Sequence, residues 1–215
     1  MKKLGLLLLP ILAVTLMLRG NAFAQNVGDN SAYFVTYFSN ANTPGAPDAT
    51  LRIINDGAEA VGESEYAPLY AAIYVFDDSQ EMRSCCACPI TTDGLLSESV
   101  NKELTANEFT GRGEMARGVI KVISSGNFGP TSLAPATGLR GWMTHIQATT
   151  TTFPSGAGND ANAVEKGPWF VTEDALADSN LTLLEWGNLE TLCSYGLTIG
   201  SGYGLCPCTP EDYDF

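Results

Sequence analysis

The chain is predicted to be an all-β protein: an antiparallel β-sandwich, or a barrel-like variant, with one short C-terminal helix fastened by disulfides. Three observations favour this class: short β-rich runs recur along the 215 residues, turn residues separate them, and no long helical pattern lies between them. The composition is 45% hydrophobic and 16% charged, which is enough to bury a core. It excludes a disordered chain, a collagen-like repeat and a polytopic membrane protein.

Six runs are expected to form strands. The Ser31–Ser39 run is dense in aromatic and β-branched residues, and the Thr50–Ile54 run ends at the strong turn sequence Asn55-Asp56-Gly57. The Leu69–Phe76 run is almost wholly apolar, as expected for a central strand covered on both faces, and Asp77-Asp78 should stop it. The other three expected strands are Gly118–Ser124, Leu139–Thr149 and Trp169–Thr172. Long surface loops are expected at 40–49 and 150–166.

One helix is predicted near the C-terminus. Thr182 and Glu185 have the spacing of a capping box, in which each side chain satisfies a free amide at the start of the helix. Trp186, Leu189 and Cys193 then recur at intervals of three and four, which places them on one face. We expect this face to pack against the sheet and Gly196 to end the helix in a left-handed conformation.

Residues 1–24 are predicted to be a cleavable export signal. Two lysines precede an apolar stretch from Leu4 to Leu18, and Ala22-Phe23-Ala24 has the small-residue pattern of a cleavage site. The stretch is about 15 residues long, and a spanning helix needs about 20. We therefore expect residues 25–215 to form a single β-rich domain that is secreted, outside the cell or at its surface, with no membrane span in the mature chain.

The formal net charge is −13, and loss of the three basic residues of the signal makes it three units more negative. So acidic a surface repels nucleic-acid phosphates and anionic lipid headgroups. The sequence therefore predicts no nucleic-acid partner.

The cysteines are the most informative residues. An even number of them in an exported chain predicts disulfides. They fall in two clusters more than 100 residues apart: Cys85, Cys86 and Cys88, and then Cys193, Cys206 and Cys208. On an extended strand Cys86 and Cys88 share one face and Cys85 points to the other. Of the 15 possible pairings we favour Cys85 with Cys193, which leaves Cys86 and Cys88 for Cys206 and Cys208. The alternative is a thiolate metal site, although the spacings differ from the C-x-x-C knuckle and an oxidising compartment competes for the thiols.

Few features of the sequence indicate catalysis or cofactor binding. His145 is the only histidine, it lies in an apolar run, and no nucleophile motif or phosphate-binding loop occurs. We therefore assign no catalytic or cofactor-binding residue and predict a non-enzymatic protein, with a carboxylate pair of the glycoside-hydrolase type as an open alternative. Calcium binding is a further alternative, although the sequence contains no EF-hand pattern. Its candidate ligands are Asp77, Asp78, Asp160, Glu211, Asp212 and Asp214.

The motifs CC-x-C-P, T-x-DGLL and GSGYG-x-C-x-C, together with the strand sequences IYVFD, GVIKVISS and LRGWMTHIQ, resemble a group of uncharacterised exported, cysteine-bridged proteins from Acidobacteriota-type bacteria. The resemblance covers most of residues 25–215. It implies secretion and cysteine bridging, and it transfers no catalytic residue. Relatives carry a further cysteine before the IYVFD strand and another in the loop after GVIKVISS; here both segments, LYAA and NFGPTSLAPATG, lack one.

The leading hypothesis for function is a secreted structural or adhesive protein, a subunit of an extracellular surface filament with copies of itself as partners. Its Ser31–Ser39 strand would complete its own sheet or pair with a neighbouring subunit by β-strand addition. The residues of that assembly strand are Tyr33, Phe34, Val35, Tyr37 and Phe38. The alternative is a carbohydrate-binding module for surface or plant polysaccharide, which would use the aromatic residues Trp142, Trp169, Tyr195 and Tyr203. A glycoside hydrolase is the third class.

Overall fold

A computed structural model of the chain describes residues 32–39, 46–57, 68–105, 115–148 and 169–199, together with Cys206 and Cys208. The elements, in chain order, are β1 (Tyr33–Ser39), β2 (Thr50–Asn55), β3 (Leu69–Asp77), β4 (Met82–Ile90), β5 (Leu95–Ser99), the π-helical turn η2 (Val100–Leu104), β6 (Arg117–Ser125), β7 (Leu139–Ala148), β8 (Trp169–Ala175), β9 (Ala177–Asp178) and the helix α2 (Leu183–Ile199).

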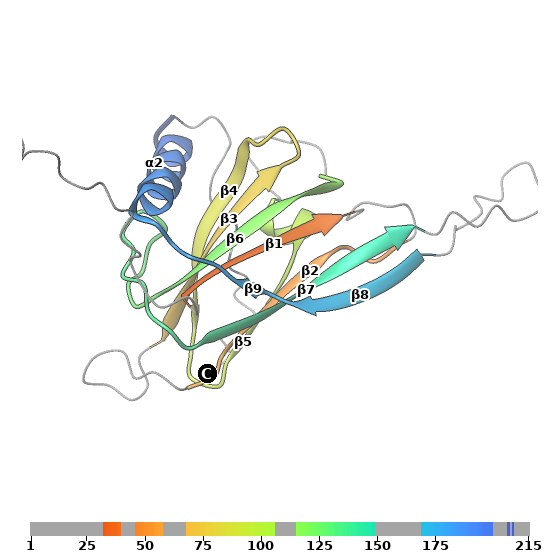
Figure 1. Cartoon of the computed structure of the whole chain (residues 1–215), viewed down its shortest axis with the longest axis horizontal. Helices are drawn as coiled ribbons and strands as arrows, with labels where there is room; N and C mark the ends of the chain where they lie inside the picture. The colour runs from red at the N-terminus through yellow and green to blue at the C-terminus, as the bar shows by residue number, and fades with distance from the viewer. Residues whose placement is uncertain are drawn as a thin grey trace, which may run out of the picture.

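The strands form two sheets that face each other (Figure 1). The five-stranded sheet has the order β4-β3-β6-β1-β9, and the four-stranded sheet has the order β5-β2-β7-β8. All strand pairs within these sheets are antiparallel. The predicted fold class, an antiparallel β-sandwich with one C-terminal helix fastened by disulfides, is confirmed.

The main core lies between the two sheets. β2 alternates buried and half-buried residues along its length, which is the period-two pattern of a strand with one face in a core. The large side chains that meet there include Phe34, Phe38, Leu51, Ile53, Ile73, Val75, Ile120, Val122, Leu139 and Met143.

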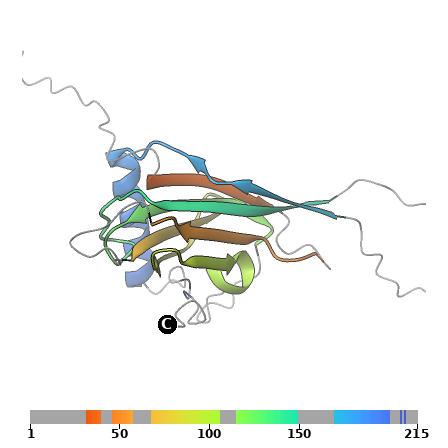
Figure 2. The same cartoon turned by 90° about the horizontal axis from the view of Figure 1, so that it is seen from below.

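A second core lies on the other face of the five-stranded sheet, where α2 covers it (Figures 1 and 2). There Leu189 and Cys193 of α2 pack with Tyr33, Tyr74 and Ile123 of the sheet. The five-stranded sheet is therefore buried on both faces, and this explains why β3 is almost wholly apolar. The prediction that this run is a central strand covered on both faces is confirmed.

The six predicted strands correspond to β1, β2, β3, β6, β7 and β8, with ends that differ by a few residues. The turn after β2 is also as predicted: Gly57 has φ +68°, and its N–H donates to the side-chain oxygen of Asn55 at 3.1 Å. β3 ends at Asp77, where a turn leads into β4. The six predicted strands leave out β4, although the predicted directions of its cysteines assume an extended strand. They also leave out β5, η2 and β9, which are short and gain their order from neighbouring elements.

The helix begins where predicted, and the hydroxyl of Thr182 accepts the N–H of Glu185 at 3.1 Å. The other half of the predicted capping box is not formed among the described residues, because the Glu185 carboxylate contacts Lys121 and Tyr33 instead. The prediction that Gly196 ends it is wrong, since α2 runs on to Ile199. A glycine inside a helix costs about 1 kcal/mol relative to alanine. Docking of the helix through Leu189 and the Cys193 bridge outweighs that penalty.

β3 and the loop after β6 lie side by side. The rings of Tyr70, in β3, and Phe128, in the loop after β6, meet edge to face with centroids 5.5 Å apart. The Tyr74 hydroxyl also donates to the carbonyl of Pro130 at 2.6 Å. Aromatic and hydrogen-bonding contacts therefore hold this loop against the sheet.

The predicted export signal, the loop 150–166, and most of the loop 40–49 lie outside the described residues. Among the described helices, none combines the length and the hydropathy required to cross a membrane.

The chain changes sheets between β8 and β9. β8 pairs with β7 in the four-stranded sheet, and β9 pairs with β1 in the five-stranded sheet. Leu176, between them, donates its N–H to the carbonyl of Gly141 at 2.8 Å and places its side chain in the main core. A Cβ on Gly141 would lie 2.5 Å from Cδ1 of Leu176, so only glycine allows this approach.

We expect Gly141→Val to destabilise the fold by about 1–3 kcal/mol, because the added side chain overpacks the corner at Leu176. Denaturant unfolding of the oxidised protein measures this change. Gly187→Ala is the control, because a Cβ at Gly187 has no heavy atom within 4 Å. That substitution should stabilise α2 by about 0.5–1 kcal/mol. Equal effects of the two substitutions would contradict the role of Gly141.

Candidate functional site

The sulfur framework centres on β4, an edge strand of the five-stranded sheet. Alternation along β4 sends Cys85 to the face under α2 and sends Cys86 and Cys88 to the main core. The disulfides are Cys85–Cys193, Cys86–Cys206 and Cys88–Cys208, with Cα–Cα distances of 5.8, 5.4 and 5.4 Å. The predicted Cys85–Cys193 bridge is confirmed, and so is the pairing of Cys86 and Cys88 with Cys206 and Cys208, whose order the sequence left open. No free cysteine remains.

The two bridges on the main-core side of β4, Cys86–Cys206 and Cys88–Cys208, bring sulfur atoms close together. The Sγ atoms of Cys86, Cys88 and Cys208 lie within 4.8 Å of one another, which is a spacing that metal ligands can have. Each of these atoms already belongs to a disulfide, and it is a thiolate that binds a metal. The arrangement therefore works as a covalent clamp that holds Cys206 and Cys208 against the core.

Polar contacts fix the position of α2 on the sheet. The carboxylate of Glu185 pairs with the ammonium group of Lys121 and accepts the hydroxyl of Tyr33 at 3.2 Å. Burial, reinforced by the negative charge of Glu185, raises the pKa of Tyr33. Further along the helix, Glu190 accepts the N–H of Leu133 at 3.0 Å. Both acidic side chains of α2 thus turn toward the body of the protein.

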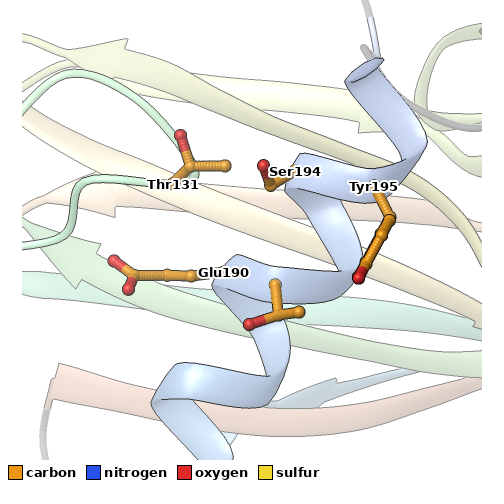
Figure 3. Close-up of a pocket in the computed structure, with 5 residues that line it drawn as sticks. Thr131, Glu190, Ser194 and Tyr195 are labelled. Atoms are coloured by element: carbon orange, nitrogen blue, oxygen red, sulfur yellow. The ribbon is translucent and has the colours of Figure 1, made fainter. Parts of the chain in front are cut away.

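An open pocket of about 500 Å³ lies between α2 and the loop after β6 (Figure 3). The lining residues are Thr131, Glu190, Thr191, Ser194 and Tyr195. In Figure 3, Glu190 and Ser194 extend from the helix on the side of Thr131, whereas the ring of Tyr195 points away from it. The groups that line the pocket are hydroxyls, one aromatic ring and one carboxylate that is engaged by the loop.

The predicted assembly strand is β1. It pairs along all seven of its residues with β6, from Tyr33 opposite Ile123 to Ser39 opposite Arg117, and at Phe34 and Val35 with β9. Phe34 and Phe38 lie in the main core, while Tyr33 and Val35 face the second core. Tyr37 is 53% exposed. β1 thus fills a slot inside the sheet.

His145 lies where β1 of one sheet meets β7 of the other. Its ring is buried and stacks on the ring of Tyr37, with centroids 4.3 Å apart. Nε2 lies 3.6 Å from a carboxylate oxygen of Asp174, and Nδ1 has no hydrogen-bond partner among the described residues. Burial lowers the pKa of His145, and the charge of Asp174 opposes this shift. The histidine is therefore a packed side chain whose burial favours the neutral ring.

The candidate calcium ligands that the structure describes are engaged by protein groups. One carboxylate oxygen of Asp77 accepts the N–H groups of Ser79 and Glu81, and the other pairs with Arg83 at 3.1 Å. Asp78 pairs with Arg117 at 2.9 Å. The other candidate ligands, Asp160, Glu211, Asp212 and Asp214, lie outside the described residues.

The aromatic residues considered for sugar binding that the structure describes do not form one cluster. Trp142 and Trp169 lie on the β7–β8 pair, opposite Ala175 and Ala148 respectively, and both are half-buried. Tyr195 lies on α2, which packs on the other sheet. Tyr203 lies outside the described residues.

Comparison of the chain with known protein families, with curated proteins and with solved structures finds no match.

The Cys85–Cys193 bridge fastens α2 to β4, and its removal tests this role. Replacing Cys85 and Cys193 together with alanine opens a loop of 108 residues, so we expect a loss of up to about 4–5 kcal/mol of stability. Hydrogen exchange should then accelerate in α2 more than in β3. The matched control is the Cys86→Ala/Cys206→Ala pair, with a sequence separation of 120, which should leave α2 protected. Unchanged protection of α2 without its own bridge would contradict this role.

The buried imidazole predicts a dependence of stability on pH. Because the pKa of His145 is lowered in the fold, the unfolded chain takes up the proton first as the pH falls below about 6.5. The neutral ring therefore makes its full contribution to the free energy of unfolding above that pH. Below it the contribution decreases, by at most about 1.4 kcal/mol per pH unit. Denaturant unfolding between pH 5 and 8 should show this loss in the wild type and less of it in His145→Gln. Parallel curves for the two proteins would rule it out.

Proposed function

We propose that this protein is an exported structural subunit that assembles into filaments by exchanging β1 between neighbouring copies. The observation that carries the proposal is the distribution of covalent bonds. All three bridges join residues 85–88 to residues 193–208, and the first cysteine of the sequence is Cys85. β1 is therefore held by non-covalent contacts alone, and it can leave its slot without breaking a bond.

Burial of β1 between β6 and β9 provides the driving force for exchange. β1 buries Tyr33, Phe34 and Phe38, and burial of one such side chain contributes about 1.5–3 kcal/mol. An empty slot between β6 and β9 would expose this apolar surface and a row of backbone groups. The β1 strand of a neighbouring copy would cover this apolar surface and pair with these backbone groups in the same register. The exchanged assembly and the monomer therefore contain nearly the same contacts.

The geometry of exchange favours an open polymer. When each copy gives its strand to the next, the interface is heterologous and adds subunits without closing. The exposed edge strand β8 offers a different route, edge-to-edge pairing, but it carries Glu173 and Asp174 on a strongly acidic protein. Charged residues at a sheet edge oppose such pairing. Exchange into the slot of β1 is thus the better supported route.

Cross-linking across the β1–β6 pair tests the proposal. Tyr37 lies directly opposite Val119. Directly opposed residues of antiparallel strands come close enough for an engineered disulfide. In Tyr37→Cys/Val119→Cys, exchange places the two new thiols of each bridge on different copies. Non-reducing electrophoresis of assembled protein should then show a ladder of covalent oligomers, which collapses to one band under reduction.

The matched control is Arg52→Cys/Trp142→Cys, across the β2–β7 pair, which exchange does not touch. This variant should give only monomers under the same conditions. Two results overturn the proposal: filaments seen by electron microscopy whose Tyr37→Cys/Val119→Cys subunits run as monomers, and full-length oxidised protein that forms no filaments at any concentration tried.

A further inference from the structure

The outward face of α2 carries no charge. From Leu183 to Leu197, the exposed residues are Leu183, Leu184, Gly187, Asn188, Thr191, Leu192, Ser194, Tyr195 and Leu197. Leu184 is 75% exposed and Tyr195 is 61% exposed. The two acidic residues of the helix, Glu185 and Glu190, are turned toward the sheet and the loop after β6.

Such a face is unusual for a helix on the surface of an acidic protein. The side of a surface helix that points to solvent is normally charged or polar. Here it carries no charge, and five of its nine exposed residues are leucine or tyrosine. The chain as a whole has 24 acidic and 11 basic residues. Two copies therefore repel each other over most of their surfaces, and the uncharged face of α2 is a place where they approach without that repulsion.

The pattern of side chains on this face is complementary to itself. Leu184, Asn188, Thr191 and Tyr195 follow at intervals of four, three and four, which is the spacing of a seam between two helices. A twofold axis midway between residues 189 and 190 places Leu184 opposite Tyr195 of a second copy, and Asn188 opposite Thr191. Apolar residues then meet apolar residues, an amide meets a hydroxyl, and the helix dipoles run antiparallel.

We propose that the exposed face of α2 binds a second copy of this chain through an antiparallel, twofold helix pair. The helix is presented as a rigid element, because the Cys85–Cys193 bridge and the contacts of Glu185 and Glu190 hold it in place. This contact uses no part of β1, so it does not depend on strand exchange. In a filament it would join neighbouring filaments side by side.

The size of the face sets the expected affinity. A helix of 17 residues is about 25 Å long, and a single pair of such helices buries less than the roughly 1,200 Å² of a standard interface. We therefore expect a weak dimer in solution, with a Kd in the micromolar range or above. Repetition of the contact along a polymer would strengthen it by multivalency.

Sedimentation velocity of the full-length oxidised protein, from about 10 μM to 1 mM, tests the pairing. The wild type should shift from monomer toward dimer, and Asn188→Glu and Thr191→Lys should each raise the dimer Kd at least tenfold. Mixing these two variants should restore dimerisation, because the antiparallel register puts the new carboxylate of one copy opposite the new ammonium group of the other.

Leu95→Glu, at an exposed leucine of β5, is the matched control and should dimerise like the wild type. The proposal is overturned if the wild type stays monomeric to 1 mM, if Asn188→Glu dimerises normally, or if the mixture fails to recover. The α2 variants should leave the covalent ladder from strand exchange unchanged, so the two proposals can fail separately.

Discussion

The covalent attachment of the C-terminal region to one edge strand is the constraint on which the rest of the structure depends. β4 presents cysteines to both faces of the five-stranded sheet, and its bridges hold α2 on one face and Cys206 and Cys208 on the other. Because the sheet is covered on both sides, its central strands are apolar throughout their length. Cys85 points to the face that α2 covers, so its bridge to Cys193 fastens this third layer to the sheet.

The disulfides divide the molecule into a covalently bridged part and a strand that is held by non-covalent contacts. Residues 85–208 are joined by bridges that close loops of more than 100 residues, whereas β1 is held by hydrogen bonds and by the burial of Phe34 and Phe38. In the proposed filament, the bridged part would keep its shape and the unbridged strand would be available to a neighbouring copy. The charge distribution adds specificity, since an acidic surface disfavours contact except where charge is absent.

Much of the candidate site followed from local pattern. The alternation of a strand was enough to separate Cys85 from Cys86 and Cys88, and hence to favour the pairing observed. The interval between Trp186, Leu189 and Cys193 was enough to choose the buried face of α2. By contrast, the stacking of Tyr37 on His145 joins residues of two different sheets, and no spacing in the chain encodes that contact. The end of α2 was misjudged at Gly196 for a related reason: docking, which is non-local, overrode a local preference.

By itself, the sequence determined the strands with strong β-propensity, the turn at Gly57, the fold class and the direction of each cysteine along β4, because these depend on residues a few positions apart. Only the tertiary structure decided which strands share a sheet, where the chain changes sheets at Leu176, and which side of α2 faces outward without charge. These features arise from packing between segments that are distant in the chain. Their energies depend on shape and on burial against a particular neighbour, and that neighbour exists only in the folded state.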